Sequence, residues 1–76
     1  MRVLASISHP TITITIFAMN DKYILKFEAG QMEQCFKIKT TDVSGIEELK
    51  LKINAEFIEL VRKRFNDMYL QMKQIS

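Results

Sequence analysis

The sequence predicts an α+β fold, in which a four-stranded antiparallel β-meander is followed by one long C-terminal α-helix packed on one sheet face. Three observations support this class. The first half holds four segments in which apolar and polar residues alternate, as in half-buried strands. Two of the junctions between them carry the residues of tight hairpin turns. In the second half, apolar residues recur at helical spacing. A chain of 76 residues has room for a single domain, with the order ββββα.

Each expected strand is short and rich in Ile, Thr, Phe or Tyr. The strands cover about residues 2–8, 11–18, 22–29 and 32–39. The first junction contains His9-Pro10, and Pro fits a two-residue hairpin turn poorly unless the peptide bond before it is cis. Such a turn would pair Ile7 with Ile12. The alternative is one long strand that bends at Pro10, and we expect the meander.

The other two junctions are Asn20-Asp21 and Gly30-Gln31. Asn and Asp tolerate a positive φ, and Gly in the first position suits a type II′ turn. Two-residue loops at both places set Ile16 opposite Leu25, Ile14 opposite Phe27, Leu25 opposite Phe36 and Tyr23 opposite Ile38. All of these pairs lie on one face of the sheet, whereas a one-residue slip would scatter them over both faces.

The expected helix covers about residues 45–75. Ser44 and Glu47 have the spacing of a capping box, in which the Ser hydroxyl accepts from an early amide and the Glu reaches back. Such a helix would be about 45 Å long, whereas an eight-residue strand spans about 27 Å. The helix is therefore too long for its sheet. It either breaks near Asn54, or its C-terminal half packs on another surface.

Two apolar stripes run along this helix. The first covers the apolar side of the sheet, where Ile12, Ile14 and Ile16 lie, and consists of Ile46, Leu49, Ile53, Phe57 and Leu60. The second repeats every seven residues, as in a coiled coil. We expect it to mediate self-association through Leu51, Ile58, Val61, Phe65, Met68, Met72 and Ile75. The alternative is one wide core that takes up both stripes, and Arg64, near the middle of the first stripe, argues against it.

Composition limits the remaining classes of protein. With one Cys and one His, the chain can form neither an internal disulfide nor a Cys/His zinc site. We therefore expect so small a domain to gain stability from a partner subunit. A net charge of +2 is low for a dedicated polyanion binder. The sequence shows neither the apolar region of a signal peptide nor a membrane-spanning run. A lone cysteine fits a reducing compartment, and we expect a cytoplasmic protein.

The groups that catalysis needs are sparse in this sequence. His9 precedes a Pro in a turn. Cys35 is expected on the outer face of the sheet opposite Lys26, and a neighbouring ammonium can make a thiol reactive, but no His completes a dyad. Glu28 and Glu33 are expected to face each other, where they can hold a divalent cation or, more simply, pair with Lys26. We expect no catalytic residue, no metal ligand and no cofactor.

The sheet face away from the helix is expected to carry Thr13, Thr15, Phe17, Lys22, Lys26, Lys37 and Lys39. Lysines and hydroxyls contact phosphates, but sheets that bind single strands usually add several aromatic side chains. We therefore expect a small non-enzymatic domain for protein interaction or regulation, homodimeric through its C-terminal helix and able to bind a further protein. Single-strand nucleic-acid binding through the Lys and Thr face is the alternative, and membrane binding is not expected.

Overall fold

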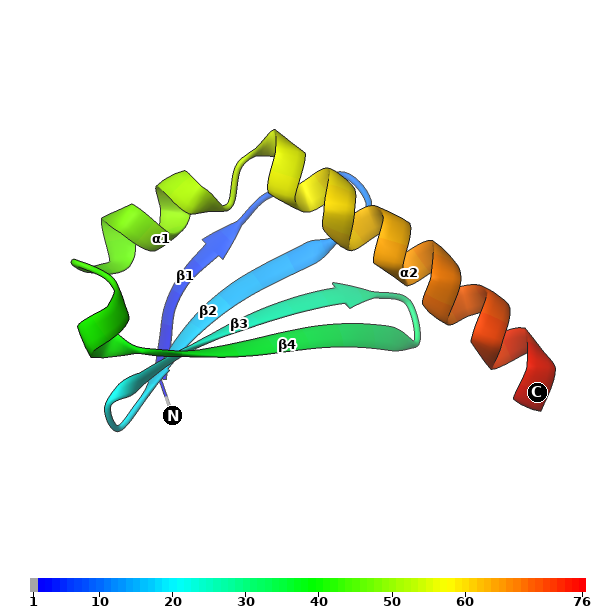
Figure 1. Ribbon diagram of the computed structural model, residues 1–76, viewed down its shortest axis with the longest axis horizontal. Coiled ribbons are helices and arrows are strands. Elements are labelled where there is room, and N and C mark those ends of the chain that lie inside the picture. The colour runs from blue at the N-terminus through cyan, green and yellow to red at the C-terminus, as the bar shows by residue number, and fades with distance from the viewer. Residues whose placement is uncertain (1) are drawn as a thin grey trace.

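The computed structural model describes residues 2–76, which form four strands, a short 3-10 turn and two helices (Figure 1). The strands are β1 (Arg2–Ile7), β2 (Thr13–Met19), β3 (Lys22–Ala29) and β4 (Met32–Lys39), and they are followed by η1 (Thr40–Asp42), α1 (Ile46–Lys52) and α2 (Ala55–Ile75). The strands pair antiparallel in the order β1-β2-β3-β4. The predicted α+β class and the order ββββα are confirmed.

The predicted pairing of the last three strands is confirmed. Ile16 lies opposite Leu25, and Leu25 lies opposite Phe36. Each connecting turn begins with a residue in the left-handed region, at a φ of 55° for Asn20 and 61° for Gly30. Turn chemistry and the apolar pattern therefore agree on one register.

The expected meander is confirmed for the first two strands, but the tight turn considered at His9-Pro10 does not form. Ile7 lies opposite Ile14 instead of Ile12, and residues 8–12 form the connection. Among residues 2–76 there is no cis peptide bond, so Pro10 cannot take the place that a two-residue turn would require. The connection is a longer loop instead. The register moves by two residues, which keeps the apolar side chains on the same face.

The helical half is interrupted at Asn54, which was the first of the two expected alternatives. Ile53 ends α1, and Asn54 begins α2 by accepting a hydrogen bond from the backbone N–H of Phe57 at 2.9 Å. Asn is among the best N-cap residues because its side-chain oxygen satisfies one of the free amides of the first turn. The break lets two helices follow the sheet where one straight helix would leave it.

The expected capping box at the start of the helix is wrong by one position. Gly45 is the N-cap of α1, with a φ of 153° that favours glycine. Glu48 therefore takes the place expected of Glu47. Its carboxylate accepts from both the backbone N–H and the hydroxyl of Ser44, the hydroxyl at 2.6 Å. Glu47 pairs instead with Lys50 at 3.8 Å.

The core lies between the helices and one face of the sheet (Figure 1). Its buried members are Ile12, Ile14, Ile16, Leu25, Phe27, Leu49, Ile53, Val61 and Phe65. The prediction that the isoleucines of the second strand face the helical half is therefore confirmed. No helix of residues 2–76 covers the other face of the sheet, and the end of α2 extends past the turn between β3 and β4 (Figure 1).

Candidate functional site

Helix α2 runs along β4 in the opposite direction, held by one polar and one aromatic contact. The side-chain amide of Gln34, which is the one buried polar residue among those described, donates to the carbonyl of Val61 at 3.0 Å. Further along β4, the rings of Phe36 and Phe57 lie 6.1 Å apart in an edge arrangement. A buried polar group that finds its partner fixes the relative position of two elements, because leaving it unpaired is costly. These contacts place α2 beside the free edge of the sheet.

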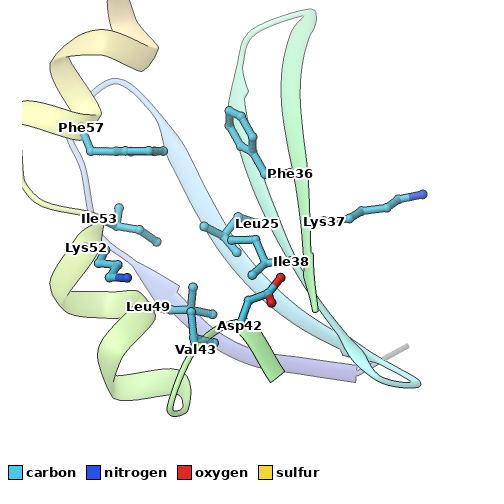
Figure 2. Close-up of a pocket in the computed structure, with 10 residues that line it drawn as sticks. All are labelled: Leu25, Phe36, Lys37, Ile38, Asp42, Val43, Leu49, Lys52, Ile53 and Phe57. Carbon is cyan, nitrogen blue, oxygen red and sulfur yellow. The ribbon is translucent and has the colours of Figure 1, made fainter. Parts of the chain in front are cut away.

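An apolar pocket of about 400 Å³ opens between α1 and the C-terminal half of β4 (Figure 2). Its lining consists of Leu25, Phe36, Ile38, Val43, Leu49, Ile53 and Phe57, together with Lys37, Asp42 and Lys52. Figure 2 shows the side chain of Lys37 pointing away from the space enclosed by the apolar residues. A pocket of this size and lining suits an apolar side chain or another apolar group.

The structure divides the heptad stripe that was expected to mediate self-association. Val61 and Phe65 are buried in the core of the same chain, and Ile58 and Met68 pack against that core. The alternative of a single core therefore accounts for the middle of the stripe. Leu51 lies in α1, is 78% exposed and is separated from the stripe by the break at Asn54.

The end of the stripe remains outside the core. Ile75 is 87% exposed and Met72 is half-buried. Together with Met68 of α2 and Met32 of β4, they line an open groove at the turn between β3 and β4. Methionine side chains adapt to irregular partners because they are unbranched and flexible. Self-association through this end of α2 stays a prediction.

Leu60 belongs to the first apolar stripe, but it is not buried in the core. It was expected to cover the sheet, but it is 60% exposed. It lies with Arg64 on the side of α2 that borders β4, since both line a shallow depression with Gln34 and Phe36. The prediction that Leu60 is covered by the chain's own sheet is wrong, because the sheet ends at β4.

The outer face of the sheet carries the predicted hydroxyls and lysines. Thr13, Lys22, Lys37 and Lys39 are exposed, and Thr15, Phe17 and Lys26 are half-buried. The Nζ of Lys26 lies 3.4 Å from Glu33 and 4.0 Å from Glu28, so this lysine already has carboxylate partners. The pairing of Glu28 opposite Glu33 is confirmed, with Lys26 between them. Nucleic-acid binding through this face stays a prediction.

The remaining reactive groups lie apart from one another. The Nδ1 of His9 accepts from the backbone N–H of Thr11 at 3.3 Å within the first loop. Cys35 is an exposed thiol on the outer face of β4. Within residues 2–76, no three His, Cys, Asp or Glu side chains lie close enough to hold a metal ion.

Among residues 2–76, the carboxyl group with the most strongly shifted pKa lies at the start of α1. Hydrogen bonds from the side chain and backbone of Ser44 lower the pKa of Glu48 to about 2, and Lys52 contributes an ion pair at 3.2 Å. This carboxylate fixes the entry into α1, which forms one wall of the pocket.

None of the helices between residues 2 and 76 is long and apolar enough to cross a membrane. Comparisons of the chain with protein-family models, with curated proteins and with solved structures find no match.

Proposed function

We propose that this chain is a small non-enzymatic protein-interaction domain that associates with a second copy of itself. The observation that supports the proposal is the unfilled apolar surface on the β4 side of the molecule. A pocket of about 400 Å³ and the exposed end of α2 both lie on this side. Association would remove both from water.

A domain of this size buries only about 60% of the surface of its unfolded chain, so its own core supplies little stability. Covering apolar surface contributes roughly 25 cal/mol per Å². Leu60 and Ile75 expose more than half of their surface. A second copy would therefore add stability that neither a disulfide nor a zinc site can supply within one chain.

The residues that line the pocket suit the binding of an apolar group better than catalysis. Its walls are mostly aliphatic and aromatic, and its charged members are Lys37, Asp42 and Lys52. Lys37 points away, and Lys52 is paired with Glu48 at 3.2 Å. An acid and a base aimed at one point are what general acid–base catalysis needs. The pocket offers apolar contact instead.

The test is the molar mass in solution, measured by size-exclusion chromatography with light scattering at low and high salt. We expect the mass of two chains at both salts, because burial of apolar surface is insensitive to screening. Ile75→Asp should weaken the dimer, whereas Asn66→Asp, at an exposed position of α2 outside this groove, should leave it intact. A chain that remains monomeric up to about 1 mM would overturn the proposal.

A further inference from the structure

In the sheet that the described residues form, strand β4 has a neighbour on one side only. In a two-residue hairpin, the residues that flank the loop form a hydrogen-bonded pair, here Ala29 and Met32, and the pattern then alternates along the ladder. Even-numbered residues of β4 therefore direct their backbone groups toward β3. Glu33, Cys35 and Lys37 direct theirs outward, where they are free to pair with another strand.

The opposite edge of the sheet is less suited to pairing. β1 has six residues, and a β-bulge interrupts it between Val3 and Ala5. Bulges twist an edge away and so protect it against further strands. β4 has eight residues that pair with β3 without interruption. It is the edge that can accept another strand.

We propose that β4 pairs antiparallel with β4 of a second copy, which joins two sheets into one of eight strands. The twofold axis is perpendicular to the sheet and sets Cys35 opposite Cys35 of the second copy. This inference names the surface used in the self-association proposed above and rests on it. The outward backbone groups of both strands then face each other, as an antiparallel ladder requires.

Among registers centred on a residue whose backbone groups point outward, charge selects this one. With Cys35 at the centre, Glu33 lies opposite Lys37 of the second copy, and the symmetry repeats this pair. Opposite charges at directly paired positions stabilise a sheet, and like charges destabilise it. If the twofold axis passed through Glu33 or Lys37 instead, that residue would lie opposite its own copy, and like charges would be paired. The same register sets Met32 opposite Ile38 on the inner face, so apolar side chains also meet.

The helices then bring the two apolar features together. α2 passes over β4 from Phe36, which contacts Phe57, toward Met32, which lines the groove at the end of α2. The exposed end of α2 therefore projects beyond the N-terminal end of β4 (Figure 1). In the antiparallel pair, this end lies beside the C-terminal half of the other β4, where the pocket of about 400 Å³ opens. Ile75 of one copy thus approaches the pocket of the other.

Area supports the involvement of the helices. A stable interface buries about 800 Å² on each partner, and a single pair of edge strands covers much less than that. Leu60 borders β4 and is 60% exposed, so the second copy would cover it as well. The helix flank, the helix end and the pocket supply the apolar area that the strands lack.

Cross-linking of the single native cysteine tests the register. Hydrogen-bonded antiparallel pairs have Cα atoms about 5.5 Å apart, within the range that a disulfide spans. We expect mild oxidation with copper phenanthroline at low protein concentration to yield a disulfide-linked dimer. The matched control carries Cys35→Ser and Thr13→Cys, which places the thiol on the same face but on β2, and it should not cross-link.

A charge swap tests the pairing itself. Lys37→Glu should raise the dissociation constant roughly tenfold, because two attractive pairs become repulsive. Adding Glu33→Lys to it should restore the dimer, with circular dichroism confirming that each variant folds. A dimer that neither cross-links at Cys35 nor responds to Lys37→Glu overturns edge pairing and leaves self-association standing. A dimer sensitive to Lys37→Glu without the cross-link overturns the register, and a permanent monomer overturns both proposals.

Discussion

Substitution of Phe65 distinguishes whether the heptad stripe forms the core of one chain or the interface between two chains. It is 5% exposed within a single chain and belongs to the core cluster beneath α2. Truncating a buried Phe to Ala costs about 3–5 kcal/mol, from lost burial and the cavity left behind. A domain of 76 residues has a total stability of about 4–11 kcal/mol, at 0.05–0.15 kcal/mol per residue. Phe65→Ala should therefore remove a large share of the stability of the monomer.

The assay is urea unfolding followed by circular dichroism at two protein concentrations that differ about tenfold. Loss of a core contact lowers the midpoint by the same amount at both concentrations, whereas loss of a seam contact acts through the dimer and depends on concentration. Phe65→Leu keeps most of the apolar volume, so this variant should fold and lose less stability than Phe65→Ala. Leu51→Ala, at a 78% exposed position of the same predicted stripe, should stay within about 0.5 kcal/mol of wild type.

Two results would refute this reasoning. One is a Phe65→Ala chain whose unfolding midpoint matches that of wild type once both are monomeric. The other is a Leu51→Ala chain that loses as much stability as Phe65→Ala. Either result would mean that the heptad stripe acts between chains, as the sequence pattern alone suggests.

Two further predictions test local features. Asn54→Ala removes the cap that accepts from Phe57 N–H and should cost about 1 kcal/mol in urea unfolding; Asn66→Ala, exposed within α2, should be neutral or stabilising. Glu48→Gln tests the lowered pKa. Because the pKa of Glu48 falls from 4.5 to about 2 on folding, the contribution of the carboxylate is complete above about pH 5 and is lost as the pH falls toward 2. The advantage of wild type over Glu48→Gln in thermal melts should follow this course, and an advantage that persists at pH 2 would contradict it.

The sheet could be predicted because independent local signals agree. Turn residues at Asn20-Asp21 and Gly30-Gln31 fix the same register as the alternation of apolar side chains, and both are confirmed. The first hairpin could not be predicted in detail, since Pro10 excludes the short turn without specifying the longer one. Length predicted that one helix would overrun the sheet, and a break near Asn54, which the structure shows, was one of the two alternatives that this left open.

The surface on the β4 side could not be predicted from helical spacing. A heptad pattern says that residues share a face, but it does not say what covers that face. Val61 and Phe65 meet the chain's own sheet, whereas Ile75 projects beyond it. The pocket depends on how far α1 stands from Ile38, which is set by tertiary packing. The exposure of Leu60 likewise reflects where the sheet ends.

An isotope-filtered NOE experiment on an equal mixture of labelled and unlabelled chains tests most directly whether this domain pairs with itself through β4. In the proposed register, Gln34 and Phe36 of different copies form a non-hydrogen-bonded pair with Cα atoms about 4.5 Å apart. We expect an intermolecular contact between the Hα protons of these two residues. A spectrum with no intermolecular contacts, or with contacts confined to the helices, would contradict it.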